Sequence, residues 1–196
     1  MAPQIDLAHV LVMGDSTGGW LAMQSAITQP AGSIKAVIGL YPQLDMRDQF
    51  YNTTFEKRLF GMLMMRTEIV DAHVAAMAPG AVMTSAYLPS RLDIACSMVQ
   101  NGRVMEFLGK AKELFPVEMV ELVESMPGVL IVHGSEDTVV PVARSKRFVK
   151  ALKRRLPGSA VRLDVRARDH GFDGDATMKE ERLKEDVELT TGYWLA

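Results

Sequence analysis

Short apolar runs alternate along this chain with longer segments in which apolar positions recur at helical spacing. Four runs are rich in Val, Ile and Leu and are bounded by Gly, Pro or charged residues, which is typical of buried β-strands. They comprise Ala8–Val12, Ile34–Leu40, Val129–His133 and Val161–Val165. This alternation predicts an α/β fold with a mostly parallel sheet.

Three of the longer segments are predicted to be helices. The first, Thr17–Thr28, directly follows the first apolar run. The second, Val142–Leu156, carries Lys and Arg in its last turns and is followed by Pro157-Gly158, a typical helix stop. The third, Met178–Leu195, is acidic at its start and apolar at intervals, a pattern typical of a surface helix.

A long segment from about residue 43 to 126 interrupts this alternation. It contains several short helical patterns and is rich in Met, as in "FGMLMMR" from Phe60 to Arg66. We expect it to be a helical cap inserted into a single domain that spans residues 1–196. Methionine adapts to irregular apolar ligands, so the cap could line a substrate pocket, although core filling is the more common role of any single Met.

Composition and charge exclude several classes of protein. The net charge is −2 with acidic and basic residues mixed along the chain, so no basic stripe for nucleic acid is expected. No apolar run approaches the roughly 20 residues of a membrane helix, and no secretory signal is visible at the start. Cys96 is the only cysteine, which excludes an internal disulfide and a cysteine-type zinc site and favours a cytoplasmic setting.

The first candidate for chemistry is the stretch "VLVMGDSTGGWLAM", where a predicted strand meets a predicted helix. A serine nucleophile in such a place needs a tight turn, and glycine two positions before and after it avoids a collision with the turning backbone. Gly14, Ser16 and Gly18 fit that G-x-S-x-G pattern, and the helix aims the amide of Thr17 at a forming oxyanion. The alternative is a Gly-rich turn with a helix-capping serine.

A serine nucleophile requires a histidine base and a carboxylate that orients it. His170 lies in the polar, Gly-containing loop "RARDHGFDGD" after the fourth predicted strand, where an imidazole can reach the serine. The other three histidines, His9, His73 and His133, are expected to be structural.

For the acid, "LIVHGSEDTVVP" ends a buried strand and continues into a loop that contains Glu136 and Asp137. The strand-loop-helix context favours Asp137 over Glu136. Asp173 and Asp175, which follow the histidine, are not expected to be the acid. The order Ser16, Asp137, His170 is the order of the triad in α/β-hydrolases.

The sequence resembles a known family along nearly its whole length. "GDSTGG", "LYPQLDMR", "HGSEDTVVP" and "DHGFD" are similar to the elbow, the following strand end, the acid loop and the histidine loop of the hormone-sensitive-lipase-like esterases, the fold-3 group of α/β-hydrolases. "VQNGRVMEFLG" and "LFPVEMVE" resemble stretches of fungal members.

The resemblance implies a three-layer α/β-hydrolase fold in which Ser16 is the nucleophile, Asp137 the acid and His170 the general base. It implies carboxylic esters with short or medium hydrophobic acyl groups as substrates. Neither a metal nor an organic cofactor is implied.

The chain departs from that family at its beginning. Members carry on the order of 100 further residues before the elbow, which supply the first strands and a His-Gly-Gly loop with further oxyanion donors. The strand Ala8–Val12 is therefore expected at a sheet edge, where it could pair with a second copy. A shortened gene model, a short protein that dimerises and a non-catalytic remnant all fit this departure.

Two functions stay open on these grounds. One is a serine esterase that acts through the triad. The other is a catalytically impaired homologue or a binding protein that uses the same pocket, as the gibberellin receptor does within this family. That receptor has lost the catalytic histidine, whereas His170 is present in this chain.

Overall fold

A parallel β-sheet forms the centre of the computed structural model, which describes residues 6–80, 89–177 and 179–196. Within that part of the chain, the sheet has four strands in the order β1-β2-β3-β4, and every neighbouring pair is parallel. The strands are β1 (Leu11–Asp15), β2 (Ala36–Leu40), β3 (Gly128–Gly134) and β4 (Val161–Arg166). The predicted parallel sheet is confirmed.

The first strand begins three residues later than predicted. A turn formed by the residues before it, in which Asp6 Oδ1 accepts the Ala8 N–H at 2.9 Å, occupies the start of the predicted run. Pairing with β2 then continues through Gly14↔Gly39 and Asp15↔Leu40. His9 therefore precedes the strand, whereas the prediction placed it inside.

Contacts divide the chain into two compact units, residues 1–45 with 111–196 and residues 46–110. The first contains the sheet with α1 (Ser16–Thr28), α6 (Pro116–Met119), α7 (Ala143–Arg155) and α8 (Glu181–Trp194), and the short 3-10 helices η2 (Lys112–Leu114) and η3 (Phe172–Asp175). The predicted insertion extended to about residue 126, but residues 111–126 belong to the unit with the sheet. Met178, the predicted start of the last helix, lies outside the described residues.

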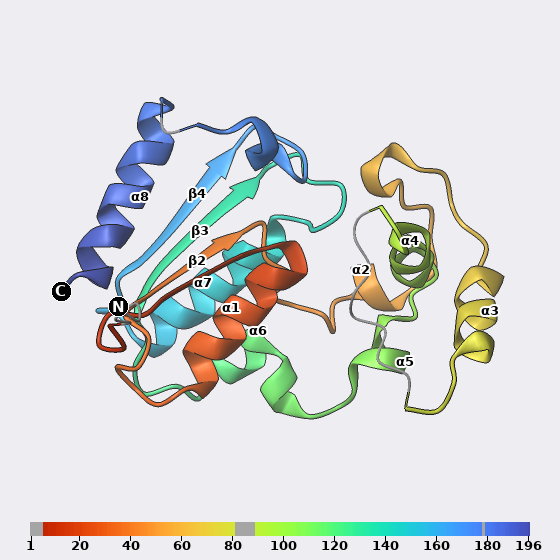
Figure 1. The fold of residues 1–196 in the computed structure, drawn as a ribbon, viewed down its shortest axis with the longest axis horizontal. Helices are drawn as coiled ribbons and strands as arrows, with labels where there is room; N and C mark the ends of the chain where they lie inside the picture. The colour runs from red at the N-terminus through yellow and green to blue at the C-terminus, as the bar shows by residue number, and fades with distance from the viewer. Residues whose placement is uncertain (1–5, 81–88, 178) are drawn as a thin grey trace, which may run out of the picture. The chain divides into compact units, whose positions relative to one another are not determined.

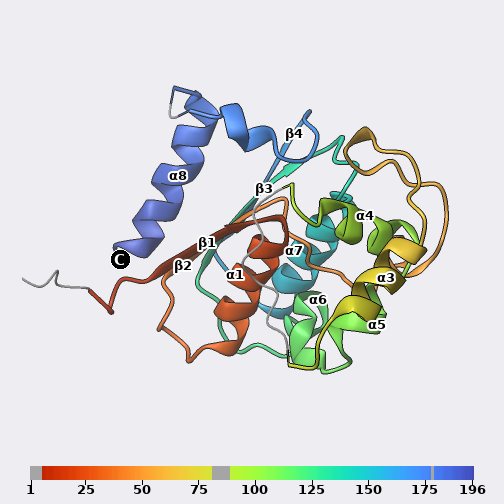
Figure 2. The same ribbon diagram turned by 45° about the vertical axis from the view of Figure 1, so that its right-hand side comes forward.

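The sheet is the middle of three layers. Each strand lies beside the one that precedes it in the chain, so right-handed crossovers put the connecting helices α1, α6 and α7 on one face, and α8 covers the other (Figures 1 and 2). Alternate residues of a strand point to opposite faces. Val37, Val129 and Ile131 pack on the first face against α1 and α7 residues such as Met23 and Phe148.

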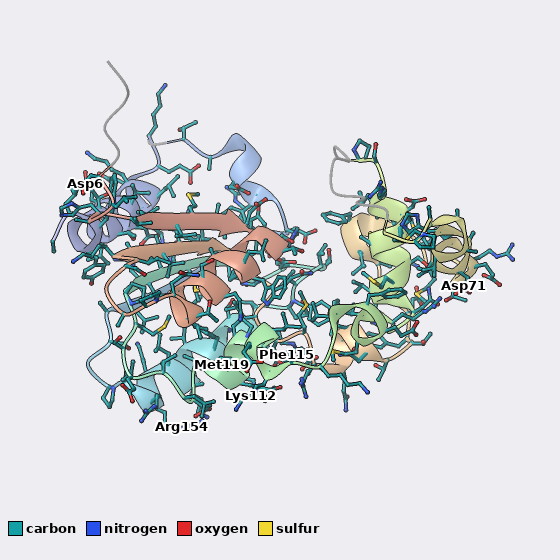
Figure 3. All side chains as sticks on the ribbon, turned by 60° about the horizontal axis from the view of Figure 1, so that its bottom comes forward. Asp6, Asp71, Lys112, Phe115, Met119 and Arg154 are labelled. Carbon is teal, nitrogen blue, oxygen red and sulfur yellow. The ribbon has the colours of Figure 1, made fainter. Side chains whose placement is uncertain are left out.

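The opposite face carries a second apolar cluster of Ile38, Leu40, Leu130 and Val132. Because β2 and β3 are buried on both faces along their whole length, they form the centre of the sheet, whereas β1 and β4 are only partly buried at its edges. α8 contacts β2 and β3. At the outside of the helical layer, the exposed Arg154 on α7 pairs with Glu121 (Figure 3).

The second unit has a small core of its own. It contains α2 (Gln49–Asn52), the 3-10 helix η1 (Leu59–Gly61), α3 (Glu68–Ala76), α4 (Leu92–Gln100) and α5 (Val104–Leu108). The Lys57 ammonium is buried and donates to the carbonyls of Thr53 at 2.6 Å and Val99 at 2.7 Å. Near the unit's surface, Asp71 on α3 pairs with Arg103 at 2.7 Å (Figure 3).

No helix in the described ranges is both long enough and apolar enough to cross a lipid bilayer.

Candidate active site

The carboxyl ends of the four strands bring the candidate residues to one edge of the sheet. Ser16 directly follows β1 and Tyr41 directly follows β2. Asp137 and His170 lie in the loops that follow β3 and β4. Because all four strands run in the same direction, these residues share the edge at which open α/β sheets hold their ligands.

Ser16 has the strained backbone that the sequence motif predicts. Its φ is 48°, in the left-handed region that residues with a side chain rarely adopt. The turn packs so tightly that a Cβ on Gly14 would lie 2.3 Å from the carbonyl oxygen of Gly18. Glycine at position 14 is therefore a spatial requirement of this turn, which places the serine between the end of β1 and the start of α1.

Gly18 differs from the prediction. A Cβ at this position would meet only Asp15 Oδ1 at 3.4 Å, an ordinary contact, so the expected collision with the backbone does not arise. The turn is held instead by Gln43, whose N–H donates to the Ser16 carbonyl at 3.2 Å. The Thr17 hydroxyl donates to the Gln43 side-chain oxygen at 2.7 Å, which fixes the residue whose amide lies at the start of α1.

The structure brings Ser16, His170 and Asp137 together in a continuous chain of hydrogen bonds. His170 Nε2 lies 3.1 Å from Ser16 Oγ, and His170 Nδ1 lies 2.8 Å from Asp137 Oδ2. Because a carboxylate only accepts, Nδ1 carries the proton of the neutral ring, and Nε2 is left as the acceptor for the serine hydroxyl. The arrangement can move a proton from Ser16 to the imidazole.

Asp137 is held as a carboxylate by its surroundings. Burial favours the neutral acid, but hydrogen bonds from His133, His170 and the Val140 N–H outweigh it and keep the pKa of Asp137 well below its ordinary value. Its Oδ1 accepts the N–H groups of Val139 at 2.9 Å and Val140 at 2.7 Å. Glu136, the weaker candidate in the sequence, is exposed.

His133 supports the acid loop. Its fully buried ring lies with Nε2 2.7 Å from the Val140 carbonyl and 3.4 Å from Asp137 Oδ2. Nδ1 lies 2.8 Å from Ser145 Oγ on α7. These contacts agree with the structural role expected for His133, because the ring ties the end of β3 to the loop and to α7.

Asp169 links two loops of the candidate site, and the sequence analysis did not single it out. Its Oδ1 accepts the N–H groups of Thr138 at 2.9 Å and of His170 at 2.7 Å. One carboxylate therefore joins the loop that carries the acid to the loop that carries the histidine. In the sequence, the only local signal for Asp169 was its position directly before His170.

The two remaining histidines have other surroundings. His9 Nδ1 lies 2.8 Å from Asp6 Oδ2 before β1, and His73 lies in the last turn of α3. Asp173, which was not expected to be the acid, accepts a hydrogen bond from the Tyr41 hydroxyl. The side chain of Asp175 lies outside what the structure describes.

Comparisons with known proteins connect this geometry to a family and to a fold. The family model described as BD-FAE matches residues 2–152. The probable carboxylesterase M8 of a Phoma species is 25% identical over 194 residues, which cover 96% of this chain and 61% of that protein.

Two solved structures are similar in fold. A protein with unknown function from Staphylococcus aureus has a TM-score of 0.67 and 17% identity, covering 94% of this chain and 64% of its own. An esterase from Pyrococcus furiosus has a TM-score of 0.54 and 15% identity, covering 96% of this chain and 55% of its own. The chain thus spans less than two thirds of the length of each of these three proteins.

Proposed function

The chain belongs to the BD-FAE family and has the α/β-hydrolase fold, and from this premise we propose that it is a serine hydrolase of carboxylic esters. Ser16 is the proposed nucleophile, His170 the general base and Asp137 the acid that orients it. The observation that carries the proposal is the relay of two hydrogen bonds, at 3.1 Å and 2.8 Å, that starts from a serine with strained backbone. The name of the relative from Phoma, a probable carboxylesterase, supports an ester as the substrate.

In the proposed acylation step, Ser16 Oγ attacks the ester carbonyl carbon while His170 Nε2 takes the hydroxyl proton. The positive charge that forms on the ring is stabilised by the Asp137 carboxylate. The tetrahedral intermediate then expels the alcohol, which takes the proton from His170, and leaves an acyl group on Ser16. In the second half of the reaction, His170 takes a proton from a water molecule that attacks the acyl carbonyl. The bond to Ser16 Oγ then breaks, Oγ takes the proton back from His170, and the carboxylic acid leaves.

The amide of Thr17 is the proposed donor to the oxyanion. It follows the nucleophile at the beginning of α1, where unpaired N–H groups and the helix dipole favour negative charge. Gln43 holds this residue through the Thr17 hydroxyl. A single oxyanion donor contributes roughly 3 to 4 kcal/mol of transition-state stabilisation.

Esters of small or medium hydrophobic acids are the proposed substrates, and residues 46–110 are proposed as the cap that sets their size. This unit exposes several large apolar side chains, among them Phe60 (45%) and Leu63 (69%). We expect Leu63→Ser to change the order of turnover in a series of acyl lengths. This role would be contradicted if both Leu63→Ser and Phe60→Ser turned over the esters in the same order of acyl length as the wild type.

We also propose that two copies pair through the edge of the sheet. Among the described residues, β1 lies at the end of the strand order and pairs with β2 alone. Met13 on β1 is 58% exposed, so this edge strand presents an apolar side chain to solvent.

Hydrolysis of a p-nitrophenyl ester series tests the proposed function. We expect the wild-type protein to turn over a short-chain ester. Ser16→Ala should lose at least about a thousandfold in kcat/KM, because alanine has no hydroxyl oxygen that could attack the ester carbonyl. Ser125→Ala is the matched control, since this exposed serine precedes β3 at the opposite end of the strand. Equal turnover by wild type and Ser16→Ala would contradict the proposal.

A further inference from the structure

Tyr41 has an unusual backbone at the edge that carries the relay. It directly follows β2 with a φ of 37°, so it is strained in the same way as Ser16. Its N–H donates to the Val132 carbonyl at 2.7 Å, which ties the strained residue to β3. The side chain is 3% exposed although it leaves the sheet at a loop edge. Such strain persists only where the surroundings hold it, and at Tyr41 they include the histidine loop.

Three contacts join Tyr41 to His170 and to two residues that follow it closely. The centroid of its ring lies 4.3 Å from that of the imidazole, with the planes tilted by 55°. Phe172 contacts the same ring edge-on at a centroid distance of 5.5 Å. The Tyr41 hydroxyl donates to Asp173 Oδ1.

Gly171 lets one short loop make all of these contacts. Its φ is 77°, so the chain reverses between His170 and Phe172 in a conformation that other residues rarely adopt. Phe172 also packs against the apolar cluster on the α8 face of the sheet, which includes Leu40 and Val132. The histidine loop is thus anchored to the sheet on one side of Gly171 and presents the imidazole on the other.

The Tyr41 hydroxyl is suited to be a permanent donor. Burial, and next the Asp173 carboxylate, raise the pKa of Tyr41 far above its ordinary value. The hydroxyl therefore keeps its proton at any working pH. That proton is committed to Asp173, so the hydroxyl has no second proton with which to act on a substrate.

The hydrogen bond to Asp137 alone does not fix the imidazole. A bond at one ring nitrogen defines a direction but leaves the ring free to tilt about it, and a tilt would move Nε2 away from Ser16 Oγ. The Tyr41 ring lies against the imidazole and blocks this tilt, while the bond to Asp173 holds the Tyr41 ring in place.

We propose that Tyr41 and Asp173 form a clamp that positions the His170 imidazole for proton transfer from Ser16. The inference rests on the proposed function, because it assigns positioning residues to that reaction. It predicts that both members act as one unit and through the imidazole. Loss of the clamp should lower kcat and leave KM unchanged, since neither side chain is assigned a contact with the substrate.

The test measures two properties in Tyr41→Phe, Asp173→Ala and the double variant. One is the second-order rate at which a fluorophosphonate labels Ser16, followed by intact mass. The other is the downfield proton resonance of the hydrogen bond between His170 and Asp137, which requires no turnover. Tyr193→Phe is the control, because it removes a hydroxyl from α8 at a tyrosine that packs against Gly128, the first residue of β3.

We expect each single variant to label roughly tenfold more slowly, with the double variant no slower than either, because both remove the same contact. Tyr41→Leu, which also loses the ring, should be slower than Tyr41→Phe. The downfield resonance should broaden in every clamp variant and stay sharp in Tyr193→Phe.

The clamp would be overturned if Tyr41→Phe and Asp173→Ala were labelled at the wild-type rate and kept a sharp resonance. It would also be overturned if the slowing in the double variant were the sum of the two single effects. A wild-type protein that is not labelled, with a resonance that still depends on Tyr41 and Asp173, would contradict the proposed function and leave the positioning role supported. The two proposals therefore fail separately.

Discussion

At the scale of single residues, Gly14 is a position of the elbow that leaves no space for a side chain. We predict that Gly14→Ala lowers the free energy of unfolding by about 1–3 kcal/mol, because its Cβ would overlap the Gly18 carbonyl. Labelling of Ser16 should fall as well. Urea unfolding followed by tryptophan fluorescence measures the free energy of unfolding, since both tryptophans, Trp20 and Trp194, lie in the unit with the sheet.

The control for this prediction is Gly158→Ala. A Cβ at Gly158 meets nothing within 4 Å, so alanine there should be neutral or slightly stabilising. Equal stability of the two variants would show that the elbow can relax around a methyl group, which would contradict the spatial requirement for glycine at position 14.

Asp137→Asn tests the direction of the second hydrogen bond in the relay. The Asn amide group would donate to His170 Nδ1, so Nε2 would carry the ring proton and could no longer accept one from Ser16. We predict that kcat falls by roughly a thousandfold or more while the fold is kept. Glu136→Gln, an exposed neighbour, should leave kcat unchanged, and a similar loss in both variants would argue against Asp137 as the acid.

The lowered pKa of Asp137 also predicts a dependence of stability on pH. The ordinary pKa of 3.8 applies to the unfolded chain, and the folded pKa lies below it. This carboxylate therefore contributes stability that is complete above pH 3.8 and is lost as the pH falls towards the folded pKa. The difference in unfolding free energy between wild type and Asp137→Asn should shrink over that acidic range, and a constant difference would contradict the assignment.

The residues of the relay could be predicted from the sequence because their signals are local. Ser16 lies in a five-residue turn motif, and Asp137 and His170 lie in loops that follow apolar strands. The partners of Tyr41 could not be predicted in this way, because Asp173 is 132 positions away. Only the sheet order, which places the ends of β2 and β4 at one edge, brings them together.

At the scale of elements, the attachment of α8 to β4 depends on two buried carboxylates. Asp164 on β4 and Asp186 on α8 are both almost fully buried. Arg166 lies between them, with Nε 2.6 Å from Asp164 and Nη2 3.3 Å from Asp186, and is itself 10% exposed. Arg162 and Arg182 add further ion pairs to the same carboxylates.

We predict that Arg166→Met lowers the free energy of unfolding by about 3–5 kcal/mol, because it removes a buried partner shared by two carboxylates. Lys184→Ala, which removes an exposed pair with Glu188 on α8, should change it by less than about 0.5 kcal/mol. Urea unfolding of both variants is the measurement. A small loss in Arg166→Met would mean that Arg162 and Arg182 alone compensate these carboxylates.

The predicted ends of a strand were close to the observed ends where the apolar run and the backbone pairing cover the same residues. The prediction for β2 and β3 was close because both are buried on two faces and read as continuous apolar runs. For β1 both ends were wrong by three residues, because a turn occupies the start of the predicted run and the strand ends on Gly14 and Asp15, which carry no strand signal. Backbone pairing with β2 extends the strand over them.

At the scale of the whole molecule, the exposed edge of β1 leads to a prediction about assembly. If two copies pair through this edge, Met13→Lys should give a monomer where the wild type gives a dimer, because a charged edge side chain opposes pairing between sheets. Light scattering after size exclusion measures the mass. Leu122→Lys, a change at an exposed leucine after α6, should keep the dimer, and a monomeric wild type would contradict the pairing.

The chain's division into two units was the least predictable feature. Apolar pattern and Met content marked an insertion from about residue 43, but its end was placed near 126. Residues 111–126 include α6 and the buried Val117 and Val120, which pack with α1 and α7 in the core of the sheet unit. Short helices of a cap and of a core have the same local pattern, so only the contacts distinguish them.

The most direct test of the central claim is intact-mass labelling of the folded protein with a fluorophosphonate, followed by peptide mapping. We predict one adduct per chain, located on Ser16, with no adduct on Ser16→Ala and a full adduct on Ser125→Ala. No adduct on folded wild-type protein, or an adduct that persists in Ser16→Ala, would contradict the proposal that Ser16, His170 and Asp137 act together as a catalytic relay.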